Sequence, residues 1–201
     1  MSFKEYIVKI DQLFFVLINN DSQNSFWDHL MIFVRTPSSW IPLYVFMVIF
    51  FIKRTGRSAW LPVLFSLMTF VITDIVSVQL KETFDRLRPC ADPAMASYIR
   101  EIVNCGGLYS FPSSHAANHF GLATFWYFFI RKIAGARWHW LWAWAALVCY
   151  AQVYVGKHFP VDVFAGAILG FISGMLMQKL FFYFWNAGLR YSSVLSIFQR
   201  S

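Results

Sequence analysis

Five long apolar segments, separated by polar connections, constrain this chain more than any other feature of its sequence. They run over approximately residues 38–53, 58–80, 115–130, 138–154 and 161–185. A helix crosses the hydrocarbon core of a bilayer with about 20 apolar residues. Only 13% of the residues are charged, whereas soluble domains have about 25%. The sequence therefore predicts an all-α, polytopic membrane helix bundle with five to six transmembrane helices.

The first 37 residues have a different pattern, which predicts an N-terminal amphipathic region on the membrane surface. Residues 1–20 place charged and apolar side chains at helical spacing, and their apolar end is too short to span a bilayer alone. A spanning helix is the alternative for these residues. Residues 25–35 predict a second short surface helix before Thr36-Pro37. We accordingly divide the chain into this region, residues 1–37, and a transmembrane domain, residues 38–201.

Basic residues gather in two connections and indicate the orientation of the bundle. The first connection holds Lys53, Arg54 and Arg57, and the third holds Arg131, Lys132 and Arg137. The long second connection, residues 81–114, balances its basic residues with acidic ones. By the positive-inside rule, the first and third connections face the cytoplasm and the second faces outward. The excess of 17 Lys and Arg over 10 Asp and Glu is thus explained as an orientation signal, and no nucleic-acid partner is expected.

Three polar stretches lie at outward ends of the apolar segments, over residues 81–89, 111–115 and 154–162. In the first stretch, Lys81 and Arg88 are seven residues apart, so they share a face if the helix continues through both. Guanidinium groups suit bidentate contact with phosphate. This pair of cations at the membrane surface therefore predicts a site for an anionic group.

The other two stretches contain groups suited to phosphate binding and catalysis. Ser113 and Ser114 precede an apolar run, and a helix that begins there would offer its backbone N–H groups to an anion. His158 and Asp162 are four residues apart, and Pro160 favours a helix start between them. This spacing lets the carboxylate accept from one imidazole nitrogen and leave the other free as a nucleophile or base.

Together these residues resemble the three-part signature of the type 2 phosphatidic acid phosphatase (PAP2) family. The matching residues are Lys81 to Arg88-Pro89, then Pro112-Ser113-Ser114-His115, then Tyr154, Gly156, His158 and Asp162. Their order, spacing and position beside apolar segments agree with the family pattern. The resemblance covers most of the chain after about residue 35 and implies the PAP2 transmembrane fold, with its active site at one membrane face.

The resemblance also implies a role for each matching residue. Lys81 and Arg88 would hold the phosphate, with help from the hydroxyl or N–H groups of Ser113 and Ser114. His158 would be the nucleophile and form a phospho-histidine, with Asp162 as its orienting partner. His115 would protonate the leaving oxygen and later activate water. The family uses no metal or other cofactor, so none is expected here.

One position departs from the family pattern. The third motif usually opens with Ser-Arg, and that arginine clamps phosphate, whereas this chain has Ala151-Gln152. Glutamine donates hydrogen bonds through its amide but carries no charge. Two alternatives are open: Gln152 still contacts the phosphoryl oxygens, or Arg86 or Lys157 supplies the missing charge.

Two of the three cysteines, Cys90 and Cys105, fall in the outward connection. A disulfide between them would close a loop of about 15 residues and contribute about 3 kcal/mol in the chain-entropy model; two unrelated thiols are the alternative. Because such bonds persist in oxidising compartments, the pair supports an outward, periplasmic position for this connection. We expect a multi-pass protein of the inner (cytoplasmic) membrane.

These features lead to the expectation of a metal-independent lipid phosphate phosphatase, whose partners are its lipid phosphate substrate and the bilayer. Undecaprenyl pyrophosphate is the first expected substrate. Phosphatidylglycerol phosphate, phosphatidic acid and the phosphates of lipid A are alternatives. A lipid phosphotransferase would use the same residues, and a non-catalytic lipid-binding protein would retain the fold alone. The sequence says nothing of the oligomeric state.

Overall fold

The computed structural model describes residues 3–21 and 24–198 of the 201-residue chain. Over these residues the chain is mostly α-helical and contains no β-sheet; the β-type pairing there is an isolated antiparallel bridge between Leu87 and Tyr109. The α-helices are α1 Phe3–Asn19, α2 Ser25–Arg35, α3 Ile41–Thr55, α4 Trp60–Phe84, α5 Ser114–Ala134, α6 Trp140–Tyr154 and α7 Pro160–Phe198. Short 3₁₀ turns are η1 Pro37–Trp40, η2 Gly56–Ala59, η3 Pro89–Ala91 and η4 Pro93–Met95.

The helices follow the segments expected from the sequence. All five apolar segments are helical, and the two N-terminal helices lie where the amphipathic patterns predict them. Proline and glycine set several boundaries: Pro37 and Pro160 begin helical turns, and Gly135 ends α5 with a left-handed φ of 68°. The last helix is longer than expected, because it continues beyond residue 185 to Phe198.

Close packing of α5 against α7 forms the centre of the bundle. Three glycines at four-residue spacing, Gly166, Gly170 and Gly174, face α5 along one side of α7. A Cβ added at Gly170 would overlap the carbonyl oxygen of Ala117 and lie 2.8 Å from the backbone nitrogen of Gly121. Glycines at this spacing let two helix backbones approach closely, as in many membrane helix pairs.

The outer surface of the bundle carries large apolar side chains. Leu67 is 59% exposed, Phe164 68% and Leu176 56%, which is a surface suited to lipid rather than to water. By length and hydropathy, the stretches over residues 37–84 and 160–188 qualify as candidate membrane spans. Helix α5 is more polar and mostly buried inside the bundle, and α6 has only 15 residues. The number of five to six transmembrane helices therefore stays a prediction.

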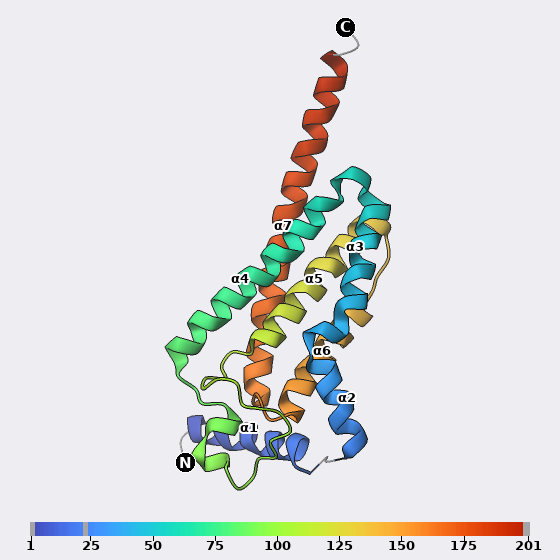
Figure 1. Cartoon of the computed structure of the whole chain (residues 1–201). Helices are drawn as coiled ribbons and strands as arrows, with labels where there is room; N and C mark the ends of the chain where they lie inside the picture. Colours follow the sequence, from blue (N-terminus) through green and yellow to red (C-terminus); the bar gives the residue numbers. More distant parts are fainter. Residues whose placement is uncertain (1–2, 22–23, 199–201) are drawn as a thin grey trace.

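The polar connections separate into two ends of the bundle (Figure 1). One end holds the long connection between α4 and α5 and the turn between α6 and α7, and α1 lies across it. The opposite end holds the basic connections after α3 and α5. Helix α1 packs on α6 and α7, and α2 packs on α6. The division of the chain at residue 37 remains a prediction.

Candidate active site

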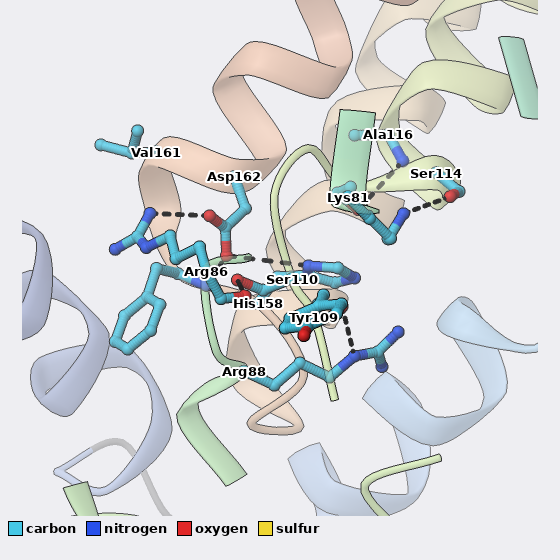
Figure 2. A network of polar contacts seen from close by, with 12 residues as sticks. Lys81, Arg86, Arg88, Tyr109, Ser110, Ser114, Ala116, His158, Val161 and Asp162 are labelled. Carbon is cyan, nitrogen blue, oxygen red and sulfur yellow. Dashed lines mark hydrogen bonds and ion pairs between the residues drawn. The ribbon is translucent and has the colours of Figure 1, made fainter. Parts of the chain in front are cut away.

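The three polar stretches meet at the end of the bundle crossed by α1 (Figure 2). Lys81 lies in the last turn of α4, and Ser114 is the first residue of α5. His158 lies in the turn that precedes α7, and Asp162 lies in the first turn of that helix. The backbone N–H of Ser113 donates to the carbonyl oxygen of Asp162 at 3.0 Å, which joins the second motif directly to the third.

Asp162 lies at the centre of a buried network. Its Oδ2 atom accepts from the backbone N–H of Phe159 at 2.8 Å, and its Oδ1 atom accepts from Arg86 Nη1 at 2.7 Å. The same guanidinium donates to Asp11 of α1 through Nη2 at 2.5 Å, and Asp11 also accepts from the backbone N–H of Val161 at 2.9 Å. Asp162 is fully buried. The carboxylate is thereby fixed in position from two sides.

His158 is 2% exposed, and its ring lies between the Asp162 carboxylate and the amino group of Lys81 in Figure 2. The Nδ1 atom is 3.8 Å from Asp162 Oδ2, which is beyond hydrogen-bond distance, so the expected hydrogen bond is not formed here. Burial lowers the pKa of His158 below its usual value of 6.5, and Arg88 and Lys81 act in the same direction while Asp162 opposes them. The ring is therefore neutral at pH 7, which keeps a nitrogen lone pair available.

The two serines lie at the start of α5, and the N-cap position expected of Ser113 is confirmed. Ser113 is the N-cap of α5, and its hydroxyl accepts from the backbone N–H of Ala116 at 3.4 Å. Ser114 accepts from Lys81 Nζ at 2.5 Å and from the Ser77 hydroxyl at 2.7 Å. Ser114 therefore fixes the amino group of Lys81 beside the start of α5, where unpaired N–H groups favour an anion.

Arg88 reaches the site by a different route from the one expected. Helix α4 ends at Phe84, and Asp85 takes a left-handed φ of 48°, so Lys81 and Arg88 do not share a helix face. This prediction is wrong, because the chain leaves the helix before Arg88. The Arg88 side chain is oriented instead by backbone carbonyl groups, donating from Nε to Tyr109 at 3.0 Å and from Nη1 to Cys105 at 3.1 Å.

The structure narrows the alternatives for the departure at position 152. Gln152 is 1% exposed, and its Nε2 atom is buried without a hydrogen-bond partner among the described residues. Arg86 is paired with Asp11 and Asp162. Lys157 donates to the backbone carbonyl oxygens of Asn104 and Cys105. The charge of Arg86 is therefore neutralised by two carboxylates. Lys157 is held by uncharged carbonyl groups, so of these two cations it is the one whose charge is not neutralised by a carboxylate.

The long connection is covalently closed by a disulfide between Cys90 and Cys105, as predicted. The segment after α4 is paired with the segment before α5, since Arg88 N–H donates to Leu108 at 2.9 Å and Ser110 N–H donates to Arg86 at 2.8 Å. The third cysteine, Cys149, is buried and free. The disulfide thus ties together the two segments that position Arg88.

Two polar residues inside the bundle, His119 and Asp74, form contacts with neighbouring side chains and backbone. His119 donates through Nδ1 to the carbonyl oxygen of His115 at 2.8 Å, and its ring packs against Trp144. Asp74 accepts from Asn118 Nδ2 at 3.3 Å, which links α4 to α5. No group of three His, Cys, Asp or Glu side chains able to hold a metal ion occurs in residues 3–21 and 24–198. Metal independence itself stays a prediction.

Sequence reasoning missed the contribution of the N-terminal helices. Asn19 Nδ2 donates to the carbonyl oxygens of Tyr154 at 2.8 Å and Arg100 at 3.0 Å. Arg100 in turn donates from Nη1 to Asp28 Oδ1 at 2.8 Å and Oδ2 at 2.7 Å. The sequence signal is a set of acidic and amide side chains on otherwise apolar helices, a pattern that predicts only an amphipathic region on the membrane surface. These residues anchor α1 and α2 to the end of the bundle where the three motifs meet.

The comparisons with known proteins agree with this geometry. The PAP2 superfamily profile matches residues 59–186. The chain is 28% identical to a lipid A 4'-phosphatase of Porphyromonas gingivalis over 89% of this chain and 76% of the relative. It is 32% identical to a lipid A 4'-phosphatase of Bacteroides thetaiotaomicron, with 86% and 77% covered. An undecaprenyl-diphosphatase of Sulfolobus acidocaldarius is 32% identical, with 65% and 58% covered.

The fold has a counterpart among solved structures. A transmembrane PAP2-type phosphatidylglycerolphosphate phosphatase from Bacillus subtilis superposes with a TM-score of 0.69 at 21% identity, over 87% of this chain and 86% of that chain. A match at this identity shows the fold. The profile match, which covers more than half of the chain, and the three motifs that converge at one end of the helix bundle show that this chain belongs to the PAP2 superfamily of membrane phosphatases.

Proposed function

We propose that the chain is a metal-independent lipid phosphate phosphatase that works through a phospho-histidine on His158. The observation that carries the proposal is the position of this buried, neutral ring between a fixed carboxylate and two cations. Asp162 faces its Nδ1 atom at 3.8 Å, which leaves Nε2 for attack. The charges of Lys81 and Arg88 both act on His158. A phosphoryl group in front of Nε2 would therefore meet positive charge.

The reaction follows from these positions in two steps. In the first step, Nε2 of His158 attacks phosphorus, the bond from phosphorus to the lipid oxygen breaks, and His115, which enters the step as the protonated imidazolium, gives that oxygen its proton and becomes neutral. In the second step, His115 removes a proton from water, the resulting hydroxide attacks phosphorus, and the bond from phosphorus to Nε2 breaks. Lys81 and Arg88 neutralise the phosphoryl oxygens throughout. As His158 becomes cationic during attack, Asp162 stabilises it.

The setting of the site favours a lipid substrate. The catalytic residues lie at one end of a bundle whose sides expose apolar side chains. A lipid in that position would place its phosphate at the interface and its chains along the bundle. The basic connections lie at the opposite end, which by the positive-inside rule supports our proposal of a multi-pass inner-membrane protein with the site on the outer, periplasmic face.

The relatives change the expected order of substrates. Lipid A 4'-phosphatases match over 86–89% of this chain, while the undecaprenyl-diphosphatase matches over 65%. We therefore propose a lipid A-type phosphomonoester as the first candidate and undecaprenyl pyrophosphate as the second. Both substrates present a phosphate at the membrane surface, so the catalytic residues serve either reaction.

A substrate panel tests the proposed function. The full chain, purified in detergent, is incubated with lipid A, undecaprenyl pyrophosphate, phosphatidylglycerol phosphate and phosphatidic acid, each with excess EDTA, and released phosphate is measured. We expect release from at least one lipid, with lipid A first, and no loss of activity with EDTA. Release from none of the four lipids would contradict a lipid phosphatase. Complete loss with EDTA, restored by a divalent cation, would contradict metal independence.

The pKa of His158 sets an expected pH dependence. Burial lowers this pKa below 6.5, so the ring stays neutral and nucleophilic as the pH falls to 6.5 and is protonated only at lower pH. We expect the acid limb of kcat/KM to have its midpoint below 6.5. The measurement is kcat/KM for the best lipid of the panel from pH 4.5 to 8. An acid midpoint above 6.5 would show that His158 is not the group that must be neutral.

A further inference from the structure

Asp11, in the middle of α1, is a buried carboxylate at the end of the bundle where the three motifs meet. It is 3% exposed. Its Oδ2 atom accepts from Arg86 Nη2 at 2.5 Å, and its Oδ1 atom accepts from the backbone N–H of Val161 at 2.9 Å. Burial raises the pKa of Asp11, and these two contacts oppose the rise. Both partners can only donate, so neither could accept a proton from Asp11, and the geometry favours the ionised carboxylate.

Anchoring of α1 does not by itself require this charge. Asn19, at the end of the helix, donates to the carbonyl oxygens of Tyr154 at 2.8 Å and Arg100 at 3.0 Å. Phe15 is fully buried, and its ring lies 5.3 Å from the ring of Phe159. These neutral contacts already hold α1 on the bundle. Because burial of a carboxylate is costly, the charge of Asp11 needs another explanation.

The guanidinium of Arg86 lies between Asp11 and a second carboxylate, that of Asp162. Its Nη1 atom donates to Asp162 Oδ1 at 2.7 Å, as Figure 2 shows, while Nη2 donates to Asp11. Its Cζ atom lies 4.4 Å from the centre of the Phe159 ring, which fixes the guanidinium further. The two carboxylates and the guanidinium together carry one net negative charge. Without Asp11, the charges of Arg86 and Asp162 would cancel.

His158 depends on that net negative charge in the proposed reaction. The charged and titratable groups that act on its ring are Asp162 of α7, Lys81 of α4, Arg88 of the connection after α4 and His115 of α5. Lys81 and Arg88 oppose a positive charge on the ring, whereas Asp162, 3.8 Å from Nδ1, favours one. The ring becomes cationic when it attacks phosphorus. It therefore needs a carboxylate whose charge is not cancelled by another partner.

We propose that Asp11 is a positioning residue for the reaction, which holds Arg86 and offsets its charge so that Asp162 stays negative toward His158. The second contact of Asp11 serves the same end, because Val161 precedes Asp162 in the first turn of α7. Asp11 thus acts through its neighbours and not by contact with the substrate. This inference rests on the proposed function of the same site.

The test compares Asp11→Asn, which removes the charge and keeps the shape of the side chain, with Asp11→Glu, which retains the charge. Asp21→Asn is the matched control, because it removes the same charge from an exposed residue just after α1. Asn19→Ala loosens α1 without a change of charge. Each full chain is purified in detergent. We measure the thermal midpoint, and kcat and KM for the best lipid from pH 4.5 to 8.

We expect Asp11→Asn to lower kcat by about 10-fold with little change in KM, because the groups that hold the phosphate are untouched. The acid midpoint of kcat/KM should fall by about one pH unit, since loss of a nearby negative charge disfavours the protonated ring of His158. Asp11→Glu should restore most of both values, and Asp21→Asn should change neither. Asn19→Ala should lower the thermal midpoint and leave the acid midpoint unchanged.

A binding measurement makes the result independent of lipid turnover. Orthovanadate, a phosphate analogue, can accept an imidazole nitrogen as a fifth ligand only from a neutral ring. Its affinity over the same pH range therefore reports the same acid midpoint. Carboxylate partners strengthen a histidine ligand, so Asp11→Asn should bind vanadate about 10-fold more weakly at pH 7.

An acid midpoint in Asp11→Asn equal to that of the unmodified chain would overturn the proposal. An equal shift in Asn19→Ala would also overturn it, because Asp11 would then only anchor α1. Failure of the unmodified chain to bind vanadate would overturn it as well. If the unmodified chain releases phosphate from no lipid, but vanadate binding shows the shift in Asp11→Asn, the proposed function fails and the role of Asp11 stands.

Discussion

Replacing His158 by alanine is expected to lower the rate of phosphate release by about 10⁴-fold or more, as loss of a catalytic nucleophile does in other hydrolases. The side chain is buried, and in the proposed mechanism it supplies the nitrogen that attacks phosphorus. A water molecule in place of the imidazole would not form the covalent intermediate that divides the reaction into two easier steps. The measurement is the initial rate of phosphate release from the best lipid of the panel, with the purified full chain.

Folding should survive this change, because Asp162 keeps its hydrogen bonds to Phe159 and Arg86 when the imidazole is removed. A thermal midpoint close to that of the unmodified chain checks this. The matched control is His29→Ala, since His29 is exposed on α2, away from the three motifs, and its ring nitrogen contacts the carbonyl oxygen of Ser25. Phosphate release by His158→Ala at the rate of the control would refute the assignment of the nucleophile.

Replacing Gly170 by alanine is expected to lower the thermal midpoint in detergent by about 6–12 °C. The added Cβ would overlap the carbonyl oxygen of Ala117, which is backbone and cannot rotate away. Overpacking of this kind costs about 3 kcal/mol at the upper end of its usual range, and 1 kcal/mol shifts the midpoint by about 2–4 °C in a chain of this size.

The consequence for activity follows from the same contact. Separation of α5 and α7 would lengthen the 3.0 Å hydrogen bond from Ser113 to Asp162, which joins two of the three motifs. We therefore expect a loss of phosphate release together with the loss of stability. Gly188→Ala is the matched control on the same helix, because nothing lies within 4 Å of a Cβ added there. Equal midpoints for the two variants would contradict the close packing of α5 and α7.

The sequence was sufficient to predict the features that depend on local pattern. Continuous apolar runs indicated the helices of the bundle, and Pro160 and Ser113 indicated where two of them begin. The disulfide from Cys90 to Cys105 followed from their shared position in one connection. The convergence of the three motifs was also predictable, because each motif lies at the end of an apolar segment on the same side of the bundle.

Features that depend on contacts between distant segments were not predictable in this way. The left-handed turn at Asp85 redirects the chain, so Arg88 is oriented by Cys105 and Tyr109 rather than by helix spacing from Lys81. Asp162 lies in the first turn of α7, where an aspartate is common in any sequence and indicates no distant partner. Only the tertiary structure shows that Arg86 joins Asp162 to Asp11, 151 residues earlier in the chain.

The central claim, that catalysis passes through a phospho-histidine on His158, is tested most directly by trapping the intermediate. The purified chain is mixed with the best lipid of the panel, quenched within milliseconds at alkaline pH, digested and analysed by mass spectrometry. The account predicts a phosphoryl group on the peptide that contains His158, present in the unmodified chain and absent in His158→Ala. Steady turnover with no phosphorylated peptide, or a phosphoryl group on another residue, would contradict it.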